Sequence, residues 1–272
     1  MYPEWNLTNR KNMFAEASAA GEVFPATGIW MSVKYNYIGG RWGLSRTGRV
    51  CGITDPFTGE TAALIPDSGS EDANAAAGAA KAACRGGGLW HESPAELRAE
   101  LFEKAAELME SFCFELARLD RIGTGKKPSD SLDDIDQAIR IFSEMAETLR
   151  SGDAARAAGE AASAVPAEAP IQDPVGVCAL ITPQKCPLLL SVQLMAPLLA
   201  AGSSIVVKPR SHTPLAVIFL FEILERAGFP AGSANLLLGR DTVCEDALFN
   251  SPDVDRVICP DREEEQSFAA VS

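Results

Sequence analysis

The 272-residue sequence has few of the residues that build metal centres and disulfide scaffolds. Its two histidines, His91 and His212, lie far apart, and its seven cysteines include no CxxC pair. An odd number of cysteines, most of them in apolar runs, is typical of buried thiols in a reducing compartment. The composition therefore argues against a metal site and a disulfide framework, and it predicts a cytoplasmic protein.

The sequence also lacks the features of membrane proteins and nucleic-acid-binding proteins. No uninterrupted apolar run reaches the roughly 18 residues of a membrane span. The first residues contain no basic segment followed by an apolar core, so we expect no signal peptide. A net charge of −13 argues against nucleic acid and anionic membranes as partners, because both repel an acidic surface.

Short apolar runs and helical periodicities indicate the order of elements in the first 150 residues. Residues 1–32 show no periodicity, and we interpret them as an N-terminal extension. From Tyr35 onwards, apolar runs between turn signals predict two or three short strands. Three helices are expected next: over 71–84, from the N-cap Ser93 to about 123, and from just after Ser131 to about 149. The buried faces of the last two are predicted to contain Leu97, Leu101, Ala105, Leu108, Phe112 and Leu116, and Ile135, Ile139, Phe142, Met145 and Leu149.

The last hundred residues alternate between strand and helix patterns. This alternation, with short links, predicts an α/β fold with a doubly wound parallel sheet and right-handed crossovers. Ligands of such sheets bind beyond the carboxyl ends of the strands, which are here the segments 181–185 and 207–211. Residues 33–150 are assigned to the N-terminal part of the same domain, 174–272 to its core, and the Ala-rich residues 151–173 to a linker. The expected core elements are strands over 175–181, 205–207, 234–238 and 254–259, helices over 187–201, 215–227 and 243–250, and a last helix opened by Pro260-Asp261.

Six blocks of sequence resemble the aldehyde dehydrogenase superfamily in both order and spacing. The blocks are IGGRW at 38–42, DPFTGE at 55–60, GTGKKP at 123–128, PVGV at 174–177 followed by Pro183 and Pro187, AAG at 200–202 followed by VKP and TP, and GFPAG at 228–232 continuing to NLLLG. The resemblance implies a Rossmann-type parallel sheet flanked by helices and preceded by short strands and a helical segment. It covers the N-terminal, NAD(P)-binding half of the family. The chain is also similar to the shortened, cysteine-lacking second unit of bidomain members.

The resemblance further implies which residues would bind a dinucleotide. Lys208 matches the family lysine that bonds the adenosine ribose, although a lysine after a buried strand can equally be a solvated strand end. Ser211 stands where the family has a glutamate that accepts from the ribose hydroxyls. Lys185 occupies the position of the asparagine that stabilises the oxyanion, and the nucleophilic cysteine and general-base glutamate are expected beyond the C-terminus, so no catalytic residue is assigned. The candidate cofactor-binding residues are Ile181, Thr182, Pro183, Lys208, Ser211, Gly239 and Arg262.

Acidic residues replace small or apolar ones at four family positions around the expected pyrophosphate. One like charge at 4 Å from a phosphate costs up to about 4 kcal/mol at an effective dielectric of about 20. Arg262, in place of the phosphate-contacting serine, supplies the only positive charge that would offset this repulsion. We therefore expect NAD(P) binding to be weak or absent. The four positions are Asp241, Glu245, Asp261 and Glu265.

Two functions are compatible with these features. The first is a noncatalytic structural or regulatory subunit, a pseudoenzyme that associates with another aldehyde dehydrogenase-like chain or with its own copies. The second is the cofactor-binding half of a split NAD(P)-dependent aldehyde dehydrogenase, which oxidises an aldehyde to an acid only with a partner chain. A truncated gene product is a third possibility. Residues 151–173 stand where the family has its oligomerisation arm, and their Ala-rich composition puts family-type tetramers in doubt.

Overall fold

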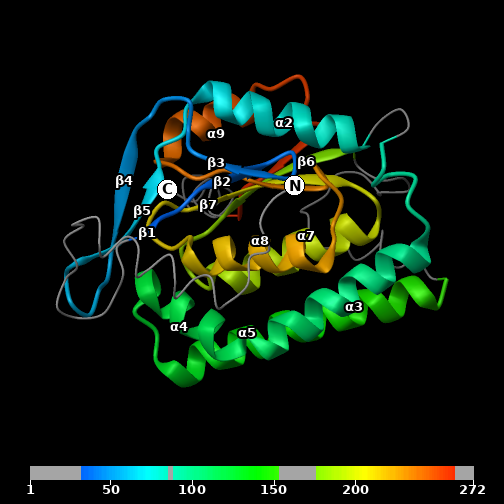
Figure 1. Ribbon diagram of the computed structural model, residues 1–272, viewed down its shortest axis with the longest axis horizontal. Helices are drawn as coiled ribbons and strands as arrows, with labels where there is room; N and C mark the ends of the chain where they lie inside the picture. The colour runs from blue at the N-terminus through cyan, green and yellow to red at the C-terminus, as the bar shows by residue number, and fades with distance from the viewer. Residues whose placement is uncertain (1–31, 85–87, 153–175, 261–272) are drawn as a thin grey trace, which may run out of the picture.

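The computed structural model describes residues 32–84, 88–152 and 176–260 (Figure 1). The N-terminal extension, most of the Ala-rich linker, and the helix expected after Pro260 lie outside the described residues. Within them, no helix is long and apolar enough to cross a membrane.

The centre of the protein is a six-stranded sheet with the order β3-β2-β8-β7-β6-β9. Strands β8, β7, β6 and β9 run parallel, and β2 joins β8 in the antiparallel sense. Every residue of β6 and β7 is buried, as expected for parallel strands covered on both faces. The bounds are β2 Asn36–Ile38, β3 Arg41–Gly43, β6 Val177–Thr182, β7 Ser204–Pro209, β8 Ala234–Leu236 and β9 Arg256–Ile258.

Helices cover both faces of this sheet, which confirms the predicted doubly wound α/β fold. Helices α2 and α9 lie on one face, and α7 and α8 lie on the other (Figure 1). A further layer of three helices, α3 to α5, packs outside α7 and α8. The bounds are α2 Ser70–Cys84, α3 Ala95–Ser111, α4 Cys113–Thr124, α5 Pro128–Arg150, α7 Pro187–Ala200, α8 Leu215–Ala227 and α9 Asp241–Phe249.

The N-terminal strands are more numerous than predicted, because they belong to two sheets. Four strands, in place of two or three, lie between Asn36 and Pro66. The hairpin β2–β3 extends the central sheet. Strand β5 pairs with β4 on one side and with β1 on the other, in a second sheet of order β1-β5-β4. The remaining bounds are β1 Ser32–Val33, β4 Val50–Thr54 and β5 Thr61–Pro66.

The prediction of a single helix from Ser93 to about 123 is wrong, because the helix is interrupted at Phe112 and forms two helices, α3 and α4. Phe112 leaves the helical conformation (φ −114°, ψ 17°), and its ring packs edge-on against Phe219 at 5.5 Å. This contact joins the break between the two helices to α8. The start differs too: Ser93 donates its hydroxyl to the Leu89 carbonyl, so it does not cap the helix. Leu97, expected on the buried face, is 43% exposed.

Helix α5 begins four residues earlier than predicted. Pro128 occupies its first turn, where the missing N–H of proline costs nothing. Ser131 therefore lies inside the helix and is fully buried. Its hydroxyl donates to Oδ2 of Asp120 at 2.9 Å, a tertiary contact in place of the predicted cap. The predicted buried face is otherwise confirmed, with Ile139 only partly buried.

Candidate functional site

The strand order reverses between β6 and β9, and this reversal marks the expected ligand end of the sheet. From β6 the chain passes through α7 to β7 on one side, whereas α9 leads to β9 on the other side of β6. Crevices at such reversals lie beyond the carboxyl ends of the strands. The candidates Ile181, Thr182 and Pro183 lie at this end and are buried. The hydroxyl of Thr182 has no hydrogen-bond partner within the described part of the chain.

Lys208 is fully buried, so its interpretation as a solvated strand end is wrong. Val206 packs on the α2 and α9 side of the sheet, and strand alternation places Lys208 on that same side. Its Nζ donates to the Pro209 carbonyl at 3.1 Å. Burial raises the pKa of the nearby Cys244 thiol to about 11, and the charge of Lys208 opposes this rise. Lys208 thus lies between the sheet and α9.

An ion pair joins the segment after β7 to α9. Nη1 of Arg210 lies 2.8 Å from Oε1 of Glu245, and the two side chains are 23% and 16% exposed. Ser211, next to Arg210, is buried. Glu245 was recognised from the sequence as an acidic replacement, whereas Arg210 was not. The signal for Arg210 was its position, because it lies between the two candidate residues Lys208 and Ser211.

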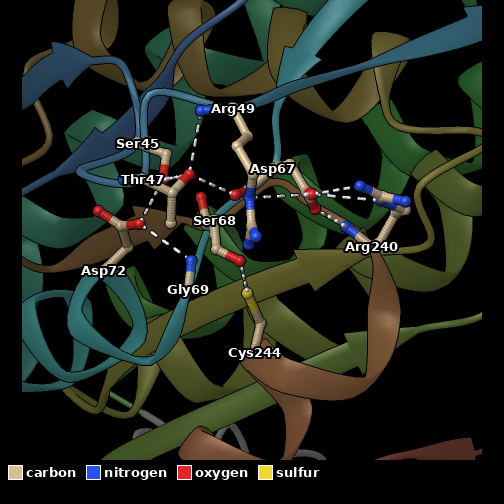
Figure 2. Close-up of polar contacts among 9 residues, drawn as sticks. All are labelled: Ser45, Thr47, Arg49, Asp67, Ser68, Gly69, Asp72, Arg240 and Cys244. Atoms are coloured by element: carbon tan, nitrogen blue, oxygen red, sulfur yellow. Dashed lines mark hydrogen bonds and ion pairs between the residues drawn. The ribbon is translucent and has the colours of Figure 1, made fainter.

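The loop between β5 and α2 passes directly over Gly239. The glycine has φ +146°, and a Cβ at this position would lie 2.7 Å from the backbone nitrogen of Ser68. Gly239 therefore permits the close approach of two chain segments. In addition, Sγ of Cys244 donates to the Ser68 carbonyl at 3.0 Å, so α9 is attached to the same loop (Figure 2).

Asp67, in this loop, binds the residue that precedes α9. Its carboxylate accepts from the backbone N–H of Arg240 at 3.1 Å, and from Nε and Nη2 of the Arg240 side chain at 3.2 and 2.7 Å (Figure 2). Nε of Arg49 lies 3.6 Å away. The hydrogen bonds from Arg240 hold the pKa of Asp67 below its usual range, although burial acts in the opposite direction.

Asp72 organises the other side of the same network. Its carboxylate accepts from the Ser45 hydroxyl at 2.6 Å and from the backbone N–H groups of Arg46 and Gly69 at 3.0 Å each. The hydroxyl of Thr47 donates to the Asp67 carbonyl at 2.9 Å. Together with the Asp67–Arg240 contacts, these hydrogen bonds connect the β3–β4 loop, the β5–α2 loop and the segment before α9 (Figure 2). Neither aspartate was recognised from the sequence, since acidic residues in or just before the first turn of a helix are an ordinary pattern.

The loop after β6 contains the remaining candidate. Lys185 is exposed. Cys186, which follows it, precedes α7 at the N-cap position. With φ 50° and ψ 52°, it is the one non-glycine residue in the described ranges with a positive φ. Arg262 lies outside the described residues, and no group of three or more potential metal ligands occurs within them.

The fold defines an α/β protein whose central, largely parallel sheet is covered by helices on both faces, and the comparisons specify the family. The aldehyde dehydrogenase family model matches residues 42–259. Betaine aldehyde dehydrogenase of Bacillus subtilis is 36% identical over 224 residues, which cover 81% of this chain and 44% of that protein. Phenylacetaldehyde dehydrogenase of Pseudomonas fluorescens is 33% identical over 236 residues, with the same coverage. The chain belongs to the aldehyde dehydrogenase family.

A solved structure of a family member agrees with this assignment. Betaine aldehyde dehydrogenase of Staphylococcus aureus, in complex with NAD+, superposes with a TM-score of 0.72 at 34% identity. The match covers 82% of this chain and 44% of that one. The chain therefore spans about half the length of the relatives it matches.

Proposed function

We propose that this chain is a noncatalytic, structural or regulatory aldehyde dehydrogenase unit whose dinucleotide crevice is closed by its own side chains. The observation that carries the proposal is the Arg210–Glu245 ion pair at the carboxyl end of the sheet. Its partner would be another aldehyde dehydrogenase-like chain or a second copy. The seven cysteines, which form no disulfide within the described part of the chain, favour a reducing cytoplasm. We propose four parts along the chain: an N-terminal extension (1–32), the N-terminal part of the domain (33–150), a linker (151–173) and the core of the domain (174–272).

On this proposal, the side chains at the carboxyl end of the sheet are not complementary to a bound dinucleotide. The family resemblance places the adenosine ribose beside Lys208 and Ser211, and the pyrophosphate beside Glu245. Lys208 is fully buried and donates to a backbone carbonyl. Ser211 offers the ribose a hydroxyl in place of a carboxylate. Glu245 adds a negative charge where the family has glycine, and it is held there by Arg210 at 2.8 Å.

We expect NAD+, NADH and NADP+ to bind this chain more weakly than millimolar, because Glu245 places a negative charge beside the expected pyrophosphate and Lys208 already donates to a backbone carbonyl. Isothermal titration calorimetry measures this directly, with the betaine aldehyde dehydrogenase of Staphylococcus aureus as the binding control. A micromolar dissociation constant for any of the three would overturn the proposal.

A variant of the Arg210–Glu245 ion pair tests, in the same titration, whether the pair weakens NAD+ binding. Glu245→Ala removes the acidic group and releases Arg210 towards a pyrophosphate, so we expect NAD+ affinity to rise by at least about tenfold. The matched control is Glu115→Ala, because Glu115 also pairs with an arginine, Arg118, but on the exposed surface of α4. Equal responses of the two variants would show that the Arg210–Glu245 pair does not close the crevice.

The position of Lys208 favours a second candidate function, the cofactor-binding half of a split NAD(P)-dependent aldehyde dehydrogenase. A lysine at the end of β7 matches the ribose-binding lysine implied by the family resemblance. Under this alternative, a chain that co-purifies with this one would supply the nucleophile and the general base. The complex would then reduce NAD+ with an aldehyde such as propanal.

The two functions differ in their response to Lys208→Ala. If the complex is a split enzyme, we expect the substitution to abolish NAD+ reduction by the co-purified chains, because the ribose contact is lost. If the chain is noncatalytic, the activity of the complex remains unchanged. The assay monitors NADH absorbance, and thermal unfolding of the variant checks that loss of a buried lysine has not unfolded the chain.

A further inference from the structure

The first turn of α3 and the loop before it present two exposed leucines beside two charged side chains (Figure 1). Leu89, in the loop between α2 and α3, is 77% exposed, and Leu97 is 43% exposed. Glu92 is also exposed, and Arg98 is partly buried. We call these four residues the α3-start surface. Apolar side chains that gather at one exposed place, with polar side chains around them, mark contacts with other proteins.

Hydrogen bonds hold the loop before α3 in one conformation. Trp90 is fully buried, and its Nε1 donates to the Ser203 carbonyl at 2.9 Å. The backbone N–H of Ser93 donates to the Trp90 carbonyl at 3.1 Å, and its hydroxyl donates to the Leu89 carbonyl. Because the backbone is fixed in this way, Leu89 and Glu92 stay on the outside, and a partner that binds them has little chain to order.

Arg98 is a charged residue without a counter-charge. Its side chain forms no hydrogen bond or ion pair with the described part of the chain, and its Nε is buried without an acceptor. Burial lowers the pKa of Arg98, and no carboxylate opposes that effect. A guanidinium nevertheless stays protonated at neutral pH. Since charges that leave water are ordinarily paired, Arg98 indicates a place for a carboxylate from another molecule.

The guanidinium of Arg98 lies close to the loop that contains Glu92. Side chains of a helix lean towards its N-terminus, and Arg98 is in the first turn of α3. A Cβ on Gly202 would lie 2.7 Å from Nη1 of Arg98 and 3.9 Å from the His91 carbonyl. Glu92, which follows His91, forms no ion pair within the described ranges. One unpaired cation and one unpaired anion therefore belong to the same small surface.

Such a surface is complementary to a copy of itself. In a twofold dimer, every contact between one residue and a second residue of the other copy occurs twice, once on each side of the axis. Arg98 of each copy can then face Glu92 of the other, with the leucines between the two pairs. The net charge of −13 makes most other contacts between copies repulsive, which favours a place where a cation is unpaired.

We propose that the α3-start surface is the interface of a homodimer in which Arg98 of each copy pairs with Glu92 of the other. The surface is small, so the dimer is weak, with a dissociation constant of about 10 to 100 μM. Leu89 and Leu97 of the two copies exclude water from around the two ion pairs, and this strengthens the attraction within each pair.

Charge reversals identify the contact in sedimentation velocity experiments. We expect the natural chain to change from monomer to dimer between about 1 and 300 μM. Arg98→Glu and Glu92→Arg each place like charges opposite each other, so each variant alone should dimerise at least about tenfold more weakly. An equimolar mixture of the two variants restores both ion pairs in a heterodimer, so its affinity should return to that of the natural chain.

The mixture also separates a pair between copies from a pair within one copy. Both variants carry like charges at positions 92 and 98 of the same chain, so an intramolecular pair gives no recovery on mixing. A natural chain that stays monomeric at about 300 μM, or a mixture as weak as the single variants, contradicts the homodimer.

Controls distinguish the interface from a general effect of charge. Glu110→Arg changes the net charge as Glu92→Arg does, but at the other end of α3, and should leave dimerisation unchanged. Leu89→Ser should weaken the dimer without unfolding the chain. If Arg98→Glu does not fold, Glu92→Arg and Leu89→Ser decide, because both side chains are exposed, and unchanged association in both rules the interface out. Arg98 lies beside Gly202, before β7 begins, whereas the crevice lies after β7 ends, so dimerisation and NAD+ binding can fail separately.

Discussion

Truncation of Phe102 to alanine is expected to lower the free energy of unfolding by about 3 to 5 kcal/mol. Phe102, on α3, is fully buried, and its ring lies 5.1 Å from Phe142 on α5 and 5.6 Å from Phe229 after α8. The side chain therefore connects the outer helical layer to the elements next to the sheet. Its removal leaves a cavity among rigid neighbours, so the loss includes both transfer and packing free energy.

The matched control for this substitution is Phe114→Ala on α4. Phe114 is 76% exposed, so its truncation should change stability by less than about 0.5 kcal/mol. Urea unfolding monitored by circular dichroism gives both values, provided that the slope with denaturant is the same for each variant. If the two phenylalanines cost the same, α3 and α5 do not pack on the core as described.

Asp67→Asn is expected to destabilise the protein by about 2 to 3 kcal/mol at pH 7. The substitution replaces a buried carboxylate, which accepts three hydrogen bonds from Arg240, with a neutral amide that is a weaker acceptor. The expected loss is smaller than for a fully buried pair, because the Arg240 side chain is 70% exposed and water can solvate it. The junction between the β5–α2 loop and α9 should weaken most.

The effect of Asp67→Asn should depend on pH. The folded-state pKa of Asp67 is lowered, so its charge contributes stability that is present above the unfolded pKa of about 4 and is lost as pH falls through the lower folded value. The difference between the natural chain and Asp67→Asn should therefore shrink below about pH 4. Chemical unfolding at pH 7 and pH 3 measures it, with the exposed Asp136→Asn as control. A difference that stays constant with pH would assign the loss to packing.

Proline and glycine explain why the last third of the fold could be predicted from the sequence. Pro183 and Pro209 end β6 and β7, Gly202 separates α7 from β7, and Gly228 ends α8 in the left-handed conformation. The predicted helix over 215–227 agrees with α8 at both ends. Phe112 has no such residue beside it. The break between α3 and α4 coincides with the packing of Phe112 against Phe219, which is distant in sequence.

The candidate site was predictable in position but not in its contacts. The predicted strand ends placed Lys208, Ser211 and Gly239 together at the carboxyl end of the sheet. Lys208 is buried because strand alternation directs its side chain to the face of the sheet that α9 covers. The sequence alone does not show that α9 lies on that face. The pairs Arg210–Glu245 and Asp67–Arg240 join residues that are 35 and 173 positions apart, so no local pattern could indicate them.

The attachment of β2 to β8 determines the order in which the chain can assemble. Tyr37 pairs with Leu236, and Oδ1 of Asn36 accepts from the backbone N–H of Leu238, across a separation of 202 residues. A loop of that length is entropically costly to close and is closed late. During synthesis, the first hairpin emerges early but acquires its neighbouring strand only after nearly all of the described chain has left the ribosome. Until then its edge stays open to other chains, which makes the nascent protein dependent on protection from aggregation.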